Sequence, residues 1–417
     1  MVSLANVALC SLSHAENWPQ WRGSNRDGIS NETGIATRFS NTENVLWRTP
    51  LPGPAGATPV IWEDQIFLTS VKDDELLLMS LSTDGDVLWS RDITSGNRDL
   101  RVDEGNFASP SPSTDGQHVW ALFGNGVLVC HNVKGDEVWR VDLQQRYGKF
   151  NIQFGMASTP VLYQDRLYLQ LIHTGGAHVI AINKQDGAEV WHQTRESDAH
   201  DECEHSYASP QLYHDDQHQL LLSHGADYIV AHRLNDGMEV WRCGGFHPDA
   251  GYDPTLRFVA SPLATPGMIV VPSAKKGILV SLKPNGRGNI TNNSAHYHWR
   301  FETTPDVPSP LKVGDYVYLC RENGNLICLE AETGKELYER RTHRQRHRAS
   351  PIYADGKIYL TARDGHITVV KTGPEFQIVA TNDMAEPISA SPAVSGGRLY
   401  LRSFEALYAI DEQTEDR

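Results

Sequence analysis

The sequence of 417 residues predicts an all-β fold, an eight-bladed β-propeller made of four-stranded antiparallel blades. Three observations predict it. A Ser/Thr-Pro dipeptide recurs through the chain, each repeat holds apolar runs separated by three tight turns, and most repeats end on an aromatic residue. A period of roughly 40–50 residues is typical of propellers, whose blades are four-stranded sheets around an axis.

The Ser/Thr-Pro dipeptide marks the start of each repeat. The eight copies are Thr58-Pro59, Ser109-Pro110, Thr159-Pro160, Ser209-Pro210, Ser261-Pro262, Ser309-Pro310, Ser350-Pro351 and Ser391-Pro392. We expect the dipeptide at the innermost strand, because a crowded axis favours small side chains and Pro is tolerated at the first residue of a strand. We therefore interpret the Ser and Thr residues as packing residues.

The strands of a repeat follow in order. An apolar run comes first and a turn such as Asp355-Gly356 comes next, which is a strong hairpin signal between alternating apolar residues. A second turn, as in residues 322–325, precedes a β-branched run, and a third turn centres on Gly, as in Asp236-Gly237. The closing aromatic residues are Trp89, Trp139, Trp191, Trp241, Trp299 and Tyr338. We expect the closing Trp on the outer strand, where it covers the gap between blades.

The first and last repeats predict how the ring closes. The eighth repeat begins at Pro392 and ends before a fourth strand, whereas residues 44–51 form a strand with Trp47 but without inner strands before it. We predict that Val45–Pro50 pairs into the last blade, and that the seventh blade uses Ile378 or Val379 in place of an aromatic residue. The alternative is an open or seven-bladed ring.

Composition narrows the classes of partner. A net charge of −15 and a pI of about 5.6 argue against nucleic acid and anionic membrane surfaces. No apolar run approaches the roughly 20 residues of a membrane-spanning helix. Five cysteines follow residue 16, and this odd count does not indicate a disulfide framework. We expect a monomer.

The N-terminus predicts export. Residues 2–12 are apolar, and Ser13-His14-Ala15 has the small-x-small pattern of a signal-peptide cleavage site. No Lys or Arg precedes them, so we interpret residues 1–15 as a truncated signal peptide; an accidental apolar tail is the alternative. The predicted organisation is residues 1–15 as signal, 16–44 as an N-terminal extension and 45–417 as the propeller.

The repeats resemble a known family. The pattern small-Ser-Pro, Asp-Gly-x-Ile/Leu-Tyr, Gly-x-Leu-x-x-Leu and Thr-Gly-x-x-x-Trp resembles the pyrroloquinoline quinone (PQQ)-like propeller repeat, most clearly in residues 157–191, 208–241 and 349–370. That family includes quinone-dependent dehydrogenases and non-catalytic BamB-type outer-membrane assembly lipoproteins. Asn17-Trp-Pro-Gln-Trp-Arg-Gly23 also looks like the start of exported members, which implies a periplasmic or other cell-envelope location.

The resemblance implies two alternative functions. In the dehydrogenases, a vicinal Cys-Cys ring and a Trp enclose the quinone, and Glu, Asn and Asp hold calcium. This chain has no Cys-Cys pair, and no position matches the calcium ligands. We therefore predict a non-catalytic scaffold that binds a protein or a small polar ligand, with no catalytic residue, metal or cofactor. The alternative is an oxidoreductase of alcohols or sugars that uses PQQ and calcium.

Loops on one face of the disc are the predicted binding surface, because loops on a rigid scaffold usually carry binding. Residues 198–205 and 247–253 are acidic and His-rich, whereas residues 342–348 are basic. The candidate ligand-binding residues are Lys149, Asn151, His205, Asp227, Arg321, Arg346, Arg348 and Arg363. The alternative is that the acidic and basic loops form a solvated face whose opposite charges pair with each other and bind no ligand. His200, Asp201, Cys203 and His205 carry zinc-type ligands but lack a recognised spacing, and residues 147–154 could line the pocket or fill the space between blades.

Overall fold

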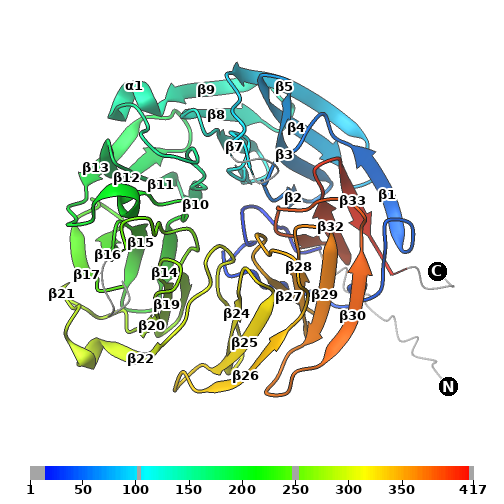
Figure 1. Cartoon of the computed structure of the whole chain (residues 1–417). Coiled ribbons are helices and arrows are strands. Elements are labelled where there is room, and N and C mark those ends of the chain that lie inside the picture. Colours follow the sequence, from blue (N-terminus) through cyan, green and yellow to red (C-terminus); the bar gives the residue numbers. More distant parts are fainter. Residues whose placement is uncertain (1–14, 101–104, 247–252, 413–417) are drawn as a thin grey trace, which may run out of the picture.

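Eight antiparallel sheets surround a central axis in the computed structural model, which describes residues 15–100, 105–246 and 253–412. Each sheet contains the four antiparallel strands of one blade in order from the axis to the rim (Figure 1), and one sheet has a short fifth strand at its edge. The predicted fold class is therefore confirmed. A single blade leaves apolar side chains on both faces, so neighbouring blades must stack to bury them.

The first four blades follow each other along the chain. Blade 1 contains β2 (Val60–Trp62), β3 (Gln65–Lys72), β4 (Glu75–Ser82) and β5 (Val87–Ser95). Blade 2 contains β6 (Ser113–Thr114), β7 (His118–Leu122), β8 (Val127–Asn132) and β9 (Glu137–Asp142). Blade 3 contains β10 (Val161–Tyr163), β11 (Arg166–His173), β12 (Gly176–Asn183) and β13 (Glu189–Thr194). Blade 4 contains β14 (Gln211–His214), β15 (Gln219–Gly225), β16 (Tyr228–Arg233) and β17 (Glu239–Cys243), and the short β21 (Gly288–Asn289) pairs with β17 in parallel.

The other four blades complete the ring. Blade 5 contains β18 (Leu263–Thr265), β19 (Met268–Pro272), β20 (Leu279–Leu282) and β22 (Tyr297–Phe301). Blade 6 contains β23 (Leu311–Val313), β24 (Tyr316–Cys320), β25 (Asn325–Glu330) and β26 (Glu336–Arg341). Blade 7 contains β27 (Ile352–Ala354), β28 (Lys357–Thr361), β29 (His366–Lys371) and β30 (Ile378–Asp383). Blade 8 contains β31 (Ala393–Ser395), β32 (Arg398–Arg402), β33 (Ala406–Ile410) and β1 (Val45–Pro50). The short helices are α1 (Leu143–Tyr147), η1 (Asp201–Glu204) and η2 (Ser294–His296).

The ring closes as predicted, by pairing the first strand with the last repeat. β1 is antiparallel to β33, with Trp47 opposite Ala409 and Pro50 opposite Ala406. In Figure 1 the blue β1 lies beside the red β33. The first and last strands of the chain are thus held in one sheet.

Outer-strand tryptophans join six of the eight blades to the next, whereas blade 6 has Tyr338 at this position. The indole nitrogen of Trp47 donates to the carbonyl oxygen of Thr83 in blade 1 at 2.9 Å, and Trp191 donates to Leu234 in blade 4 at the same distance. The same contact occurs for Trp89, Trp139, Trp241 and Trp299. The acceptor lies in the loop between the third and outer strands of the next blade, so the side chain covers the gap between blades.

Blade 7 lacks this tryptophan, and the predicted substitute was wrong. Ile378 and Val379 do not take its position; the register of β29 and β30 places Ala380 there, opposite Val369. The N-terminal segment compensates for the small side chain. Phe39 is buried in the same apolar cluster as Ala380, and its backbone N–H donates to Asn382 Oδ1 at 3.0 Å.

The Ser/Thr residues before Pro form a closed hydrogen-bonded ring at the axis. From Thr58 to Ser350, the backbone N–H of each residue donates to the hydroxyl of its counterpart in the next blade at 2.9–3.1 Å, in the order Thr58, Ser111, Thr159, Ser209, Ser261, Ser309, Ser350 and Ser391. The hydroxyl of Thr58 closes the ring by donating to the carbonyl of Ser391 at 3.1 Å. Blade 2 uses Ser111-Pro112, so the assignment to Ser109-Pro110 was two residues early.

The N-terminal segment packs on the innermost strands. Trp18 pairs with Ile61 in β2, and the side chain of Gln20 exchanges hydrogen bonds with the backbone of Leu162 in β10. Arg22 is buried and donates to the carbonyl of Pro310 beside β23 at 2.7 Å. The segment thus contacts the innermost strands of several blades at once.

None of the helices in the described residues has the length and apolar character needed to cross a membrane. All five described cysteines are buried and free, which agrees with the absence of a disulfide framework in the sequence.

Candidate functional site

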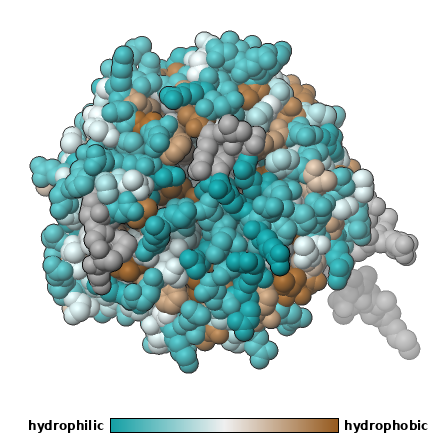
Figure 2. All heavy atoms as spheres, in the orientation of Figure 1, coloured by the Kyte–Doolittle hydropathy of each residue, from teal (hydrophilic) through white to brown (hydrophobic). Residues whose placement is uncertain are grey.

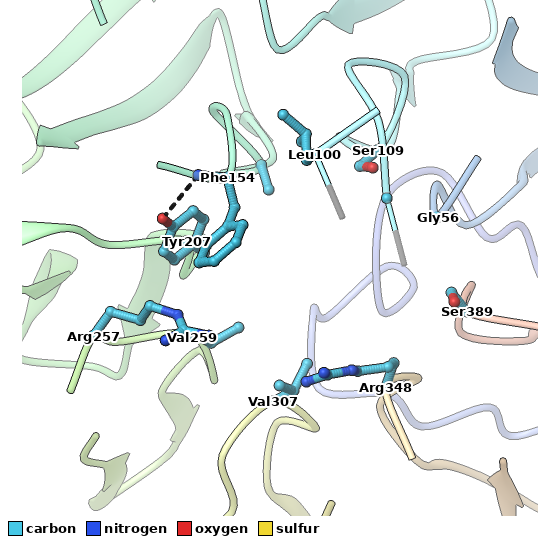
Figure 3. A pocket seen from close by; sticks show the side chains of 12 residues that line it. Gly56, Leu100, Ser109, Phe154, Tyr207, Arg257, Val259, Val307, Arg348 and Ser389 are labelled. Carbon is cyan, nitrogen blue, oxygen red and sulfur yellow. Dashed lines mark hydrogen bonds between the residues drawn. The ribbon is translucent and has the colours of Figure 1, made fainter. Parts of the chain in front are cut away.

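A funnel opens at the axis where the loops before the innermost strands converge. Its cavity has a volume of about 220 Å³. Leu100, Phe154, Tyr207, Val259 and Val307 form its apolar wall, and each comes from a loop before a different blade (Figure 3). Residues distant in the sequence therefore form one surface because the ring brings the starts of all blades to one axis.

Below the funnel the channel becomes polar. A second cavity of about 140 Å³ is lined by the Ser/Thr ring, with Trp21 of the N-terminal segment among its walls. Seven of the eight ring hydroxyls accept a hydrogen bond from a neighbouring backbone N–H, and the Thr58 hydroxyl donates to the carbonyl of Ser391, so all eight already take part in structural hydrogen bonds.

Two arginines are the charged side chains among the described walls of the funnel, and each is paired with a glutamate. Figure 3 shows the side chains of Arg257 and Arg348 extending toward each other from opposite sides. Arg257 lies over the ring of Phe154 at 4.8 Å and pairs with Glu202 at 3.0 Å. Arg348 pairs with Glu322 at 3.3 Å. Burial raises the pKa of the nearby Tyr207 to about 12, so this phenol stays neutral; its oxygen accepts the backbone N–H of Phe154 at 3.2 Å.

A basic groove of about 410 Å³ lies beside blade 6. Its cations are Lys275, Lys276, Arg321, Arg344 and Arg346, and its acids are Asp306 and Glu322. Hydrophilic side chains gather over the sector of β24 to β29 in Figure 2. Five cations against two acids leave an excess of positive charge, which favours an anionic ligand.

The two carboxyl groups in this groove have unequal affinities for a proton. Burial, a hydrogen bond with Glu322 and the charge of Glu322 raise the pKa of Asp306 to about 6. Burial also acts to raise the pKa of Glu322, but the Asp306 hydrogen bond and the charges of Arg348 and Lys275 outweigh it and lower that pKa. Glu322 is therefore the anion that holds the surrounding cations together, with Lys275 at 3.3 Å and Arg346 at 3.8 Å.

The structure brings together four of the eight predicted residues. Arg348 lines the funnel, and Arg321 and Arg346 line the basic groove. Arg363 lies next to them, because its backbone N–H donates to the carbonyl of Arg346 at 2.7 Å. The ion pairs of these arginines are made with acids of the same region. Arg321 pairs with Glu339 at 3.2 Å, whereas Arg346 and Arg348 pair with Glu322.

The other four predicted residues lie on the blade 3 and blade 4 side and outside the walls of the funnel. Lys149 and Asn151 are exposed in the loop before blade 3. His205 is buried, with its Nε2 2.9 Å from the hydroxyl of Thr174, and burial lowers its pKa. Asp227 is buried in the turn between β15 and β16. Whether these four bind a ligand stays a prediction.

Phe154, Tyr207 and Arg257 line the funnel and were absent from the predicted residues. Each belongs to a loop before a blade. For residues 147–154 the sequence allowed two roles, lining the pocket or filling the space between blades, and both occur. Phe150 and Ile152 pack on the apolar core between blades 2 and 3, whereas Phe154 reaches the funnel. Sequence position identified the loops, but which side chains face the axis depends on how each loop folds.

The described walls of the funnel do not suit PQQ with calcium. Calcium prefers carboxylate and carbonyl oxygens, and no Asp or Glu of the described residues lines the funnel. The described cysteines are buried in other positions. The cluster of His200, Asp201, Cys203 and His205 is also not assembled: the Cys203 thiol lies 3.1 Å from the carbonyl of Leu256, whereas His205 contacts Thr174. Residues 247–252 of the neighbouring loop lie outside the described residues, as do residues 1–14 of the predicted signal peptide.

Comparisons with solved structures agree on the fold. BamB from Moraxella catarrhalis has a TM-score of 0.64 and 14% sequence identity, covering 87% of this chain and 100% of that chain. A europium-containing methanol dehydrogenase has a TM-score of 0.70 and 11% identity, covering 94% and 90%. The computationally designed Ika8 protein has a TM-score of 0.61 and 12% identity, covering 88% and 99%. At these identities the likeness concerns the fold alone.

Comparisons of sequence identify the family. No curated protein matches the chain. The family described as outer membrane protein assembly factor BamB matches residues 101–244 and 289–374, which is more than half of the 417 residues. With eight phased repeats, a closed ring of eight blades and this match, the chain belongs to the BamB-type family of PQQ-like repeat β-propellers.

Proposed function

We propose that this chain is a non-catalytic scaffold in the cell envelope, and that its loop face binds an acidic segment of another protein. The funnel would take an apolar side chain of that segment, and the basic groove would take its carboxylates. The proposal requires no cofactor and no bond-making chemistry.

The observation that carries the proposal is one loop shared by two cavities. Residues 342–348 supply Arg348 to the apolar funnel and Arg344 and Arg346 to the basic groove. An extended segment can contact both cavities by crossing this loop. A hydrophobic anchor beside complementary charges is a common arrangement at protein interfaces, where the anchor supplies affinity and the charges supply specificity and association rate.

Family membership supports a protein partner and an envelope location. The family carries the description of an outer membrane protein assembly factor, and the predicted signal peptide would place this chain in the same compartment. The enzyme alternative has less support, because the described funnel walls offer arginines and apolar groups but no carboxylate for a general base or a calcium ion.

Photo-crosslinking tests the proposed binding face. A benzophenone amino acid replaces Val307 in the funnel or, as a control, the exposed Val138 on the outer strand of blade 2. After irradiation in envelope extracts, we expect adducts at position 307 whose crosslinked peptides, mapped by mass spectrometry, are rich in Asp and Glu. Equal adducts at both positions, or none at position 307, would contradict the proposal.

Charge reversal tests the groove in the same assay. Arg344→Glu with Arg346→Glu should reduce the adducts by about tenfold or more, because the loss of two complementary charges at an interface costs on the order of 1–2 kcal/mol. Lys134→Glu with Lys335→Glu makes the same change of charge in two outer turns and should leave the adducts unchanged.

Reconstitution tests the enzyme alternative. The full chain is incubated with PQQ and calcium and passed through gel filtration. Retained quinone absorbance together with alcohol- or sugar-dependent dye reduction would overturn the non-catalytic proposal. We expect the quinone to elute separately from the protein.

A further inference from the structure

Two histidines and an aspartate converge on the loop face beside blade 7. His343 belongs to the loop before β27, whereas Asp364 and His366 flank the turn between β28 and β29. One nitrogen of each histidine and one Asp364 oxygen all lie within 4.8 Å of one another. None of the three lines the funnel or the basic groove.

The donor atoms are close to the geometry of a metal site. His343 Nε2 lies 2.9 Å from Asp364 Oδ2, and His366 Nδ1 lies 3.1 Å from the same oxygen. The two imidazole rings are nearly parallel, with centroids 4.3 Å apart, so both present a nitrogen to one carboxylate. Ligands at about 2.0–2.2 Å from a tetrahedral zinc ion are about 3.3 Å apart, so only small side-chain movements are needed.

One of these nitrogens has no hydrogen bond. His366 Nδ1 is inaccessible to solvent and has no hydrogen-bond partner among the described residues, although the Asp364 oxygen is close. The atom contacts Asp364 Oδ2 at 3.1 Å without the geometry of a hydrogen bond. A cation between the imidazole nitrogens and the carboxylate would satisfy this atom.

The opposite side of the same ring faces a second carboxylate. His366 Nε2 lies 3.7 Å from Asp383 Oδ2. Metal-binding histidines commonly direct their other ring nitrogen to a carboxylate, which fixes the tautomer and strengthens the ligand. Asp383 is in the right place to orient His366 in this way.

The backbone holds the ligands in a fixed arrangement. Gly365, between Asp364 and His366, has a φ of +92°, and a Cβ there would lie 2.3 Å from the carbonyl oxygen of Glu386. Gly324 lies against the backbone of His343, and a Cβ added at Gly324 would be 1.9 Å from the His343 carbonyl oxygen. Both loops are therefore packed against neighbouring turns, which reduces the reorganisation needed to bind an ion.

We propose that His343, Asp364 and His366 form a binding site for a divalent transition-metal ion of the zinc type. Two imidazoles and one carboxylate are donors that suit zinc and related ions better than calcium or magnesium. The three side chains are partly exposed, so one coordination position stays open to water or to an anionic group. The ion would also link the loop of residues 342–348 to the β28–β29 turn.

Metal titration of the full chain tests the site. After chelator treatment and dialysis, the protein is titrated with Zn²⁺ by calorimetry and with Co²⁺ by visible absorption, which reports coordination geometry. We expect one saturable site, Co²⁺ bands that Zn²⁺ removes, and a Tm that rises with Zn²⁺ because the ion binds the folded state. His343→Gln and His366→Gln should each weaken binding by about 100-fold or more, since even partners outside the ligand shell affect affinity 10- to 100-fold.

Two control variants make the result specific. His218→Gln removes a comparable His–Asp contact, His218 with Asp215 at 3.1 Å, and should not change the affinity. Asp383→Asn keeps the ligands and should weaken binding by about tenfold. Circular dichroism without metal shows whether each variant is folded. Absence of saturable binding, or equal affinity in wild type and both ligand variants, would overturn the proposal, and neither result depends on a protein partner.

Discussion

At the scale of single residues, the Ser/Thr positions have two functions. The sequence predicted packing, because only small side chains fit near the axis, and these side chains are indeed buried. The structure adds a hydrogen-bonding function that sequence spacing does not show. Seven of the eight hydroxyls satisfy the backbone N–H of the preceding blade.

Ser261→Ala tests this function. The substitution removes the acceptor of the Ser209 N–H, now at 2.9 Å, and leaves a buried donor without a partner. We expect the free energy of unfolding in urea to fall by about 1–3 kcal/mol.

Ser158→Ala is the matched control. Ser158 is also buried, but its hydroxyl has no hydrogen-bond partner among the described residues. Its removal should be neutral or slightly stabilising. Equal losses in the two variants would show that the ring contributes packing alone.

At the scale of elements, the third turn of a blade is a docking site for the preceding blade. Gly237 has a φ of +72°, and a Cβ there would lie 2.4 Å from Trp191 Cε3. The recurrent Gly of the sequence therefore serves both the turn and the neighbouring tryptophan. The sequence showed the turn, whereas the contact between blades required the structure.

Comparison of Gly237→Ala with Gly356→Ala should separate the cost of backbone strain in the turn from the cost of a clash with the neighbouring tryptophan. Gly356 has a φ of +73°, and a Cβ there meets nothing within 4 Å, so its substitution measures backbone strain of about 1–2 kcal/mol. Gly237→Ala adds a clash with Trp191 and should cost about 1–3 kcal/mol more. Thermal and urea unfolding measure the difference, and equal losses would contradict a docking function of the turn.

At the scale of the whole molecule, blade 8 is the only blade of the described ring whose outer strand comes from the other end of the chain. The chain itself joins every pair of neighbouring blades, including blade 8 to blade 1 through residues 51–59, so the ring is closed inside blade 8 by the pairing of β1 with β33. Between blades 7 and 8, the N-terminal segment contributes Phe39 where the aromatic residue is missing. The N-terminal part of the chain therefore completes the ring at two adjacent places.

Trp47→Ala tests the closure, with Trp191→Ala as the control inside the ring. Both variants lose an indole hydrogen bond to the next blade. Trp191 is buried and its loss should cost about 3–5 kcal/mol, whereas Trp47 is partly buried and its loss should cost less. We expect Trp47→Ala to increase amide hydrogen exchange in β1 and β33, because only noncovalent contacts hold β1 in its blade.

Trp191→Ala should leave exchange in its own blade largely protected, because β13 is continuous with the strands on which it packs. Similar exchange in the two variants would mean that the closing strand is no weaker than the others.

The candidate site was less predictable than the fold. Charge identified residues 342–348 as basic, and Arg346 and Arg348 do line cavities. Phe154, Tyr207 and Arg257 were missed because a loop sequence does not show which side chain turns to the axis. The zinc-type ligands were sought in residues 200–205, where they are close in sequence, but the assembled group joins residues 343 and 364–366.

The number of blades, their strand order and the closure by β1 can be predicted from the amino-acid sequence, because they follow from repeated local patterns and from the first repeat's missing strands. In contrast, the place of Ser111 in the ring, the replacement of a tryptophan by Ala380 and the contact between His343 and His366 are visible only in the folded molecule. The physical reason is that strand pattern depends on neighbours in the chain, whereas a site depends on side chains that the ring brings together from distant loops.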